Sequence, residues 1–593
     1  MPSRSAAPWF AAAAAAIPSL LAYNVAPSPT FLNQALAFAL WPAFALALAP
    51  LAAARGAATL QAALALLVAA GLWSWLGAAL PASLALSLIG SLLAAAVMVA
   101  SGAGARARLQ ADAAGLAAVD LFAAFCWGWV VSGALNVAIA IVQVFWAGAI
   151  DGDWIAHSGF PGRAVGNLRQ PNHLSSLLLW SCIAAAVLLQ LGRLRARWAA
   201  ALFAPFVFAV VLTASRTGLV SVLLLAVWGG LDRRLARPVR GLLIAAPLVY
   251  AVSWLGMAQW AAASAHSFGG TERLAETDIS SSRFAIWRDT LALIRQQPWT
   301  GVGFGEFNYA WSLTPSPHRP TALFDHTHNL PLQLAVELGL PLALLITGLL
   351  VWALWQGARR AWLASGELGT AQRSAMVMVL MIGLHSLLEY PLWYSYFLLP
   401  AAWAWGFALW QAPQPAEAPR SPPPPQACST ALVLANVALV IGAALAVLDY
   451  GRVAAIFSAD EGAAPLEQRI AAGQRSLLFA HHADYAAVTS GVATADPAHA
   501  FDRATHYLLD TRLMIAWSRS LAERGQLDAA RFVADRLREF RKDDAEAFFQ
   551  ACADAPASAV AAGSAASAAS AAAETFPCER PLRAPGWREL AAH

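Results

Sequence analysis

Charged residues are scarce in this sequence. Lysine, arginine, aspartate and glutamate make up 12% of its 593 residues, whereas 59% are hydrophobic. Soluble domains carry roughly 25% charged residues, so the shortage excludes a soluble globular protein and indicates a membrane protein. The net charge of +4 is small, and we expect no nucleic-acid partner.

Charge-free apolar stretches fill the first three quarters of the chain. Most are close to the ~20 residues that a helix needs to cross ~30 Å of hydrocarbon. We therefore predict an all-α, polytopic membrane helix bundle of about thirteen spans, with a margin of one or two. The stretches are Trp9 to Tyr23, Phe31 to Ala54, Leu60 to Leu80, Ala82 to Ala103, Leu121 to Trp146, Leu174 to Leu191, Trp198 to Thr213, Leu219 to Leu231, Leu242 to Trp260, Leu330 to Trp355, Met376 to Leu388, Leu392 to Trp410 and Ala431 to Leu448.

Cysteine is also scarce, at five residues, and no two of them have metal-ligand spacing. His326 and His328 could begin a zinc site, but no third ligand accompanies them. We expect no metal and no cofactor. Cys552 and Cys578 lie in the predicted extracytoplasmic tail, where oxidation is permitted, and a single bridge between them is an open alternative.

The arginines occupy every second loop between the apolar stretches. Cytoplasmic loops retain positive charge, so these loops are predicted to be cytoplasmic. The loops 147–173, 214–218 and 261–329 and the tail from Asp449 are then extracytoplasmic. A signal peptide over residues 1–23 is the alternative, but no cleavage site follows a clear basic region, and we predict a retained anchor. The arginines are Arg4, Arg55, Arg106, Arg108, Arg193, Arg195, Arg197, Arg233, Arg234, Arg237, Arg240, Arg359, Arg360 and Arg420.

Composition divides the chain into four parts. Residues 1–410 form the predicted membrane catalytic body, 411–429 a proline-rich linker, 430–448 the last transmembrane helix, and 449–593 a periplasmic helical tail. Amphipathic segments over 500–550, broken at Gly525, resemble a tetratricopeptide-like hairpin, which is usually a packing or docking unit. Residues 555–574 are of low complexity.

The loop 261–329 is longer than a connector requires. Ser281 or Ser282 could cap a helix that runs to Gln297 and stops at Pro298. Its predicted apolar stripe would lie on the membrane surface or on the bundle, with Arg283 and Arg288 beside it, facing lipid headgroups. The stripe comprises Phe284, Trp287, Leu291 and Ile294.

Polar motifs gather at the predicted outer boundary, where ionisable side chains are costly and are therefore candidates for function. They are RQPNH at 169–173, SRTG at 215–218, the arginines of the long loop, and HTHN at 326–329. Asn329 is a candidate N-cap, and the free N–H groups of that helix end suit a diphosphate. Asn329, Gln333 and Glu337 share one face, which either binds substrate or only packs against polar neighbours.

These residue types suit glycosyl transfer. Arginine supplies permanently charged, bidentate donors for a diphosphate leaving group. Histidine can accept a proton from an acceptor hydroxyl near neutral pH. Arginines on the diphosphate and a histidine base would suffice for inverting transfer without a metal.

Several motifs together resemble the O-antigen ligase and polymerase superfamily. They are SRTG, SSRFAIWRDTL, PWTGVGFGEF and DHTHNLPLQLAVELG, in this order. GNLRQPNHLSS and HSLLEYPLWYSYFLLP narrow the resemblance to the bacterial protein O-oligosaccharyltransferases of the pilin-glycosylation ligase type. The resemblance covers roughly residues 120–450.

The resemblance implies an enzyme that transfers an oligosaccharide en bloc from undecaprenyl diphosphate to Ser or Thr of pilin or other periplasmic proteins. By motif, His328 takes the place of the essential histidine, and Arg216 and Arg283 take the place of the diphosphate-binding arginines. The second histidine, His326, departs from the pattern and leaves the identity of the base open. The remaining candidate substrate-binding residues are Gln170, Asn172, Arg288, His326, Asn329, Gln333, Tyr390 and Tyr394.

Other functions have to be weighed against this one. Lipopolysaccharide O-antigen ligase or O-antigen polymerase would use the same donor chemistry with a sugar acceptor. A transporter or flippase predicts inverted repeats and charges near the bilayer midplane, neither of which the sequence displays. A scaffold that only anchors the tail would leave the outside arginines and histidines without a role.

Overall fold

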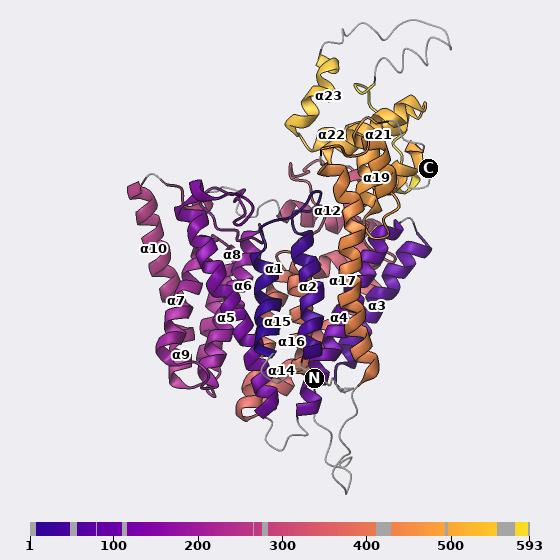
Figure 1. The fold of residues 1–593 in the computed structure, drawn as a ribbon. Helices are drawn as coiled ribbons and strands as arrows, with labels where there is room; N and C mark the ends of the chain where they lie inside the picture. The colour runs from indigo at the N-terminus through magenta and orange to yellow at the C-terminus, as the bar shows by residue number, and fades with distance from the viewer. Residues whose placement is uncertain are drawn as a thin grey trace, which may run out of the picture. The chain divides into compact units, whose positions relative to one another are not determined.

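The protein is helical throughout the part that the structure describes. This computed structural model describes residues 7–47, 56–78, 80–109, 116–264, 266–275, 283–410, 429–459, 461–492, 496–553 and 576–590. Within these ranges every regular element is a helix and no strand occurs, as the sequence predicted (Figure 1). Arg4, Arg55, Ser281, Ser282, Arg420, Cys428, most of the predicted linker and the low-complexity segment lie outside the described residues.

The chain divides into two compact units. Unit 1 comprises Met1–Leu66, Ser91–Thr277 and Gly348–Val447, and unit 2 comprises Leu67–Gly90, Asp278–Thr347 and Leu448–His593. The tail and the long loop from Asp278 onward therefore belong to the same unit, although more than 100 residues separate them in the sequence.

Seven described segments are long and apolar enough to cross a membrane. Five further apolar helices are shorter. A further helix, α15 (Gly366–Ser386), covers the predicted stretch from Met376. Every predicted apolar stretch overlaps a helix; beyond the seven, the number of spans stays a prediction. The seven are α3 (Ala58–Leu76), α4 (Ala82–Leu109), α5 (Leu116–Phe145), α6 (Pro171–Gln190), α9 with α10 (Arg237–Ile244, Ala246–Ser264), α14 (Leu330–Leu363) and α17 (Thr430–Phe457), and the shorter ones are α1 (Ala7–Leu20), α2 (Phe31–Ala47), α7 (Ala196–Leu212), α8 (Arg216–Leu231) and α16 (Ser395–Leu409).

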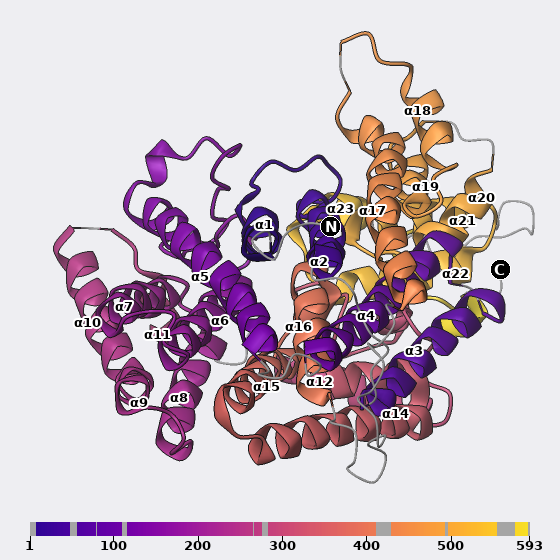
Figure 2. The same ribbon diagram turned by 60° about the horizontal axis from the view of Figure 1, so that its bottom comes forward.

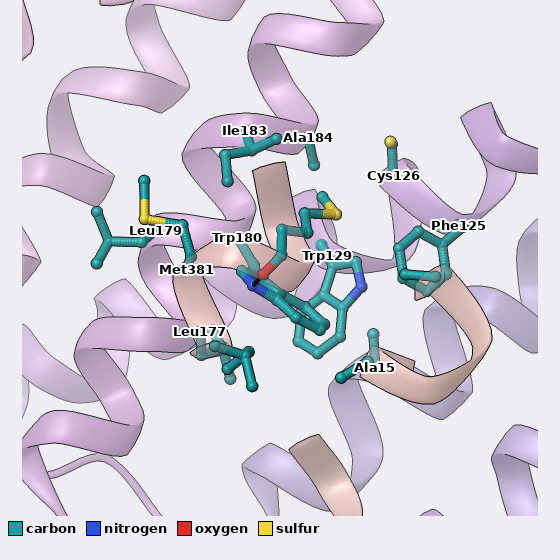
Figure 3. Packing of buried hydrophobic residues seen from close by; sticks show 14 of the residues in the cluster. Ala15, Phe125, Cys126, Trp129, Leu177, Leu179, Trp180, Ile183, Ala184 and Met381 are labelled. Carbon is teal, nitrogen blue, oxygen red and sulfur yellow. Dashed lines mark hydrogen bonds between the residues drawn. The ribbon is translucent and has the colours of Figure 1, made fainter. Parts of the chain in front are cut away.

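In unit 1, α5 runs between α1 and α6 (Figure 2). Gly128 permits this, because a Cβ there would lie 2.5 Å from the Ala11 carbonyl oxygen. At the centre of the core, the indole rings of Trp129 and Trp180 meet edge to face at 4.7 Å, and Trp180 Nε1 donates to the Met378 carbonyl at 3.0 Å (Figure 3). These contacts fix α6 against α5 and α15.

The ends of α8 and α15 are paired within unit 1. Asp232, which directly follows α8, accepts a hydrogen bond from Arg373 Nε near the start of α15 at 2.8 Å, and both side chains are buried. The start of α8 and the end of α15 also lie close together, because Asn172 is hydrogen-bonded to both Ser215 and Glu389. The candidate site residues of unit 1 lie around these two helix ends.

Unit 2 combines the long loop with the tail. The loop forms α12 (Arg283–Gln296) and α13 (Phe307–Leu313). In the tail, α21 (Thr511–Glu523) and α22 (Leu527–Glu539) form the predicted hairpin around Gly525, whose φ is +77°. A disulfide joins Cys552 to Cys578. The other tail helices are α18 (Leu466–Gly473), α19 (Ala480–Thr489), α20 (Pro497–Ala504), α23 (Asp543–Ala553) and α25 (Trp587–Leu590).

The buried face of α12 differs from the predicted stripe. Ile286, Leu293 and Ile294 are buried, whereas Phe284 is 66% and Leu291 is 42% exposed. Two apolar stripes overlap on this helix, and periodicity alone does not say which one faces the protein. The exposure of Phe284 and Leu291 agrees with the alternative in which the stripe lies on the membrane surface, which stays a prediction.

Candidate functional site

The N-terminus of α6 carries the RQPNH motif. Gln170 is the N-cap: its Oε1 accepts a hydrogen bond from the Asn172 backbone N–H at 2.5 Å, and Pro171 occupies the first turn, where a missing N–H is tolerated. Arg169, directly before the cap, has a φ of +59° and donates through Nη2 to the Ala22 carbonyl at 2.8 Å. A non-glycine residue in this left-handed region costs energy that the surrounding contacts must offset.

The structure explains the serine and the glycine of the SRTG motif. Ser215 is the N-cap of α8, because its Oγ accepts from the Gly218 N–H at 3.0 Å. A Cβ at Gly218 would lie 2.3 Å from Ser175 Oγ of α6. Glycine therefore lets the start of α8 approach α6. Arg216 is the first residue of α8, and its Nη2 donates to the Arg273 carbonyl at 3.2 Å.

A hydrogen-bond network joins three of the motifs within unit 1. Ser215 Oγ donates to Asn172 Oδ1 at 2.7 Å, and Asn172 Nδ2 donates to Glu389 Oε1 at 2.9 Å. Glu389 is 6% exposed and directly precedes Tyr390. The predicted residues Asn172, Arg216 and Tyr390 thus belong to segments that this network holds together.

Aromatic rings line the segment after Glu389. Tyr390 and Tyr394 stack with 6.2 Å between ring centroids and an interplanar angle of 23°. The ring of His173 meets Tyr394 edge to face at 4.5 Å, and His173 Nδ1 is hydrogen-bonded to the Tyr396 hydroxyl at 3.0 Å. His173 is 2% exposed, which suits a structural role.

The HTHN segment of unit 2 is a capped and tightly folded turn. Asn329 Oδ1 accepts from the Leu332 N–H at 3.0 Å, so Asn329 caps α14 as predicted. Thr327 Oγ1 donates to the Asn329 carbonyl at 2.9 Å, and Gln333 Oε1 accepts from the Thr327 N–H at 2.8 Å. His328, between them, is partly exposed and has a φ of +56°. The turn thus holds the His328 backbone in a sparsely populated conformation, as is common at functional sites.

The polar face of α14 continues inward from this turn. Gln333 Nε2 donates to Glu337 Oε1 at 2.9 Å, and both side chains are buried. The contact supports the alternative in which Gln333 and Glu337 pack against polar neighbours, and it also ties Gln333 to the turn that carries His328.

His326 differs from His328 in its electrostatic environment. His326 Nδ1 lies 3.0 Å from Asp325 Oδ1. Burial lowers the pKa of His326, but the Asp325 carboxylate outweighs that effect and raises it above its ordinary value. Burial raises the pKa of Asp325, but its partner His326 lowers it to about 2. His326 therefore holds its proton to higher pH than an isolated histidine does.

The PWTGVGFGEF motif clamps the middle of α14. The Val302 N–H donates to the Val336 carbonyl at 2.8 Å, and the Leu340 N–H donates to the Pro298 carbonyl at 2.7 Å. Gly339 has a φ of +73°, and a Cβ on it would lie 2.4 Å from the Trp299 carbonyl carbon. The glycine permits direct backbone contact, which bends α14 just after Glu337.

The arginines of the long loop lie on α12. Trp287 Nε1 donates to the Thr327 carbonyl at 2.9 Å, so α12 packs on the turn that carries His328. Arg283 opens the helix and is partly exposed, whereas Arg288 is exposed. Of the predicted residues, unit 2 thus holds Arg283, Arg288, His326, His328, Asn329 and Gln333, and unit 1 holds Gln170, Asn172, Arg216, Tyr390 and Tyr394.

Sequence reasoning missed three residues that organise these two groups. Glu389 lies in the motif used for the resemblance, Ser215 in the SRTG motif, and Thr327 between the two histidines. A lone acidic residue between two apolar stretches was a usable signal for Glu389, because unpaired buried carboxylates are rare. Among the described residues, no group of three or more His, Cys, Asp or Glu side chains could hold a metal ion.

Comparison with known proteins connects these motifs to three families. Residues 199–347 match the O-antigen ligase family, residues 164–189 the protein glycosylation ligase family, and residues 374–552 the family described as virulence factor membrane-bound polymerase, C-terminal. The general O-oligosaccharyltransferase of Acinetobacter baylyi is 29% identical over 279 residues, which cover 44% of this chain and 46% of that protein.

A second protein of the same organism, the ComP-specific O-oligosaccharyltransferase, is 29% identical over 279 residues, covering 46% of this chain and 47% of its own length. The chain thus matches about half the length of these relatives. The matches confirm the resemblance inferred from the motifs: the chain is a relative of the bacterial protein O-oligosaccharyltransferases within the O-antigen ligase superfamily.

Proposed function

We propose that this protein transfers an oligosaccharide en bloc from undecaprenyl diphosphate to Ser or Thr hydroxyls of pilin or another periplasmic protein. It does so in the inner membrane, with its reacting groups on the periplasmic side. Arg216 and Arg283 hold the diphosphate, and His328 activates the acceptor hydroxyl. The guanidinium groups supply the positive charge for the leaving group, so the route requires no metal ion.

The proposed step is a single inverting displacement. The acceptor oxygen attacks the anomeric carbon of the first sugar while the bond from that carbon to the diphosphate oxygen breaks. The hydroxyl proton passes to the imidazole of His328, and undecaprenyl diphosphate leaves with its charge stabilised by the arginines. One glycosidic bond forms, one glycosyl-phosphate bond breaks, and no oxidant or reductant takes part.

The ion pair at Asp325 supports the choice of His328 over His326 as the base. A base must be unprotonated at the working pH, and Asp325 raises the pKa of His326. His328 lies two residues further on, in the turn that Thr327 and Asn329 hold. His326 is then suited to hydrogen bonding with substrate or to orienting the turn.

The main support for the proposal is the hydrogen-bond network that joins three of the motifs. Asn172, Ser215 and Glu389 come from separate parts of the sequence, and their hydrogen bonds bring Arg216 and Tyr390 to one side of unit 1. A permanent positive charge and aromatic rings on the same side of the unit suit a diphosphate attached to a sugar. Gln170, Arg288, Asn329, Gln333 and Tyr394 complete the proposed substrate-binding set.

A second candidate function has an observation in its favour. Two of the matched families are named for O-antigen ligation and for membrane-bound polymerisation. In that case the acceptor would be a sugar hydroxyl of lipopolysaccharide or of a growing polymer, with the same donor and the same base.

Co-expression decides between the two functions. The full chain is produced with a lipid-linked glycan pathway and a candidate pilin in a host that lacks its own ligase, and the intact masses of pilin and lipopolysaccharide are measured. A glycan-sized increase on pilin supports protein transfer, and an increase confined to lipopolysaccharide selects the second candidate.

Substitution of His328 tests the mechanism. His328→Ala is expected to lower transfer by about two to four orders of magnitude, the usual contribution of a general base, without loss of membrane insertion. His318→Ala is the matched control, because His318 is an exposed histidine of the same loop. Glycosylation at the level of the His318 variant would remove His328 from the mechanism.

A further inference from the structure

We propose that Glu389 is a positioning residue that holds the first turn of α8, and with it Arg216, in place for the lipid donor. The inference rests on the proposed function and adds to it a residue that neither the sequence nor the comparisons single out. Glu389 lies at the end of α15, between the last turn of that helix and the stacked tyrosines.

Asn172 is a hydrogen-bond partner of Glu389. Asn172 Nδ2 donates to Glu389 Oε1 at 2.9 Å, and the side chain of Glu389 is 6% exposed. The backbone N–H of Glu389 donates to the His385 carbonyl at 2.8 Å, which continues α15 by one turn and fixes the origin of the side chain. A buried carboxylate requires such a partner, because an unpaired buried charge is costly.

From Asn172 the network reaches the donor-binding arginine. Asn172 Oδ1 accepts from Ser215 Oγ at 2.7 Å, and Ser215 Oγ in turn accepts from the Gly218 N–H at 3.0 Å. The Glu389 carboxylate thus orients the Asn172 amide, and this amide orients the Ser215 hydroxyl, which caps α8. Arg216 is the residue that follows the cap.

The direction of the hydrogen bond from Asn172 to Glu389 can be tested by exchanging the amide and the carboxylate. In Asn172→Asp two carboxylates face each other at hydrogen-bond distance and the amide donor is lost. In the double variant Asn172→Asp with Glu389→Gln, the new amide of residue 389 can donate to the new carboxylate of residue 172, which still accepts from Ser215. The direction of one hydrogen bond is reversed, and the rest of the network is retained.

We expect variants that keep a hydrogen bond between residues 172 and 389 to bind the lipid donor better than variants that lose it. The full chain in lipid nanodiscs is assayed for transfer with undecaprenyl-diphosphate-linked oligosaccharide. Glu389→Ala and Asn172→Asp should raise the KM for the donor on the order of ten- to a hundredfold, as loss of a hydrogen bond to a charged group implies, with a smaller effect on kcat. Glu389→Gln should stay within about fivefold of wild type, less than the tenfold that one such hydrogen bond contributes, and the double variant should recover most of the loss that Asn172→Asp causes.

Ser176→Ala is the matched control. Ser176 Oγ shares a hydrogen bond with His385 Nδ1 at 2.8 Å, between the same two helices but outside the network. It should leave the donor KM unchanged, which separates positioning from general loosening of α6 against α15. If Glu389→Gln is as impaired as Glu389→Ala and the double variant regains nothing, the carboxylate itself acts on the substrate and the positioning role is refuted.

A second measurement does not depend on turnover. Amide hydrogen exchange over residues 216–219 reports the first turn of α8, and the Gly218 amide is one of its donors. Faster exchange in Glu389→Ala and Asn172→Asp, reversed in the double variant, supports the network even if wild type transfers no glycan to any acceptor. Unchanged exchange in Glu389→Ala overturns the network, whatever the activity of the protein.

Discussion

Two adjacent histidines in the tail predict that unit 2 loses stability in acid. His481 and His482 open α19 and are 5% and 8% exposed. The ring of Tyr507 lies 4.5 Å from the His481 ring and 4.7 Å from the His482 ring, and His481 Nδ1 is hydrogen-bonded to Ser83 Oγ at 3.0 Å. Burial lowers the pKa of His482 from 6.5 to about 4, and it lowers the pKa of His481 well below its ordinary value.

The sign and size of the effect follow from these values. Between pH 6.5 and 4 the unfolded chain binds a proton at residue 482 and the folded chain does not, so stability falls as the pH falls. At pH 5 the pH lies about 1.5 units below the ordinary pKa of 6.5 and above the folded-state pKa, so His482 alone lowers the free energy of unfolding by about 2 kcal/mol. His481 adds to this in the same direction. The expected loss is large against the ~5–15 kcal/mol that stabilise a typical domain.

Amide hydrogen exchange of α19 measures this loss. The free energy of opening, corrected for the intrinsic pH dependence of exchange, should fall by about 2 kcal/mol or more between pH 7 and pH 5. His482→Phe keeps a ring and removes the titrating group, so the fall should be about 2 kcal/mol smaller. His499→Phe, at an exposed position of α20, is the control. A fall of the same size in wild type and His482→Phe would refute the reasoning.

Three further predictions concern stability and donor binding. Gly339→Ala places a Cβ against the Trp299 backbone at positive φ and should lower the free energy of unfolding by about 3 kcal/mol, read from thermal melting. Replacing Cys552 with Ser opens a bridge that spans 26 residues and should destabilise the tail by about 3 kcal/mol, read from its rate of limited proteolysis. Arg216→Ala and Arg283→Ala should each raise the donor KM on the order of tenfold or more, measured by steady-state transfer.

Controls for these variants lie close by. Gly348→Ala, on the same helix as Gly339, meets no atom within 4 Å and should be neutral or stabilising. Reductant should accelerate proteolysis of wild type but not of the Cys552 variant. Arg295→Ala removes another basic residue of α12 and should leave the donor KM unchanged. Equal donor KM values in wild type and both site variants would place the diphosphate elsewhere.

Local sequence patterns predicted the elements and their polar ends. Each apolar stretch became a helix because length and hydropathy are properties of one segment. Asn329 caps α14 for the same reason: a cap needs only its own helix. The hairpin at Gly525 is equally local, since a single glycine ends one helix and the next begins within two residues.

Contacts between distant segments were not predictable in the same way. Glu389 and Asn172 are 217 positions apart, and no pattern in either segment names the other. The approach of the Trp299 backbone to Gly339 depends on two glycine-rich segments meeting, which a single sequence does not reveal. Phe284 and Ile286 of α12 are both apolar, and only packing against neighbouring residues decides which one is buried in the protein.

The segment after the disulfide packs on the loop that is hydrogen-bonded to the bend of α14. Trp587 meets Tyr309 edge to face at 6.4 Å, and Arg588 Nη2 donates to the Gly301 carbonyl at 3.3 Å. Gly301 belongs to the loop whose backbone grips residues 336–340. Shortened versions of this protein that stop before residue 576 would therefore lose a brace of the helix that carries Asn329. Expression work aimed at an active enzyme should keep residues 576–590 and attach no bulky fusion beside them.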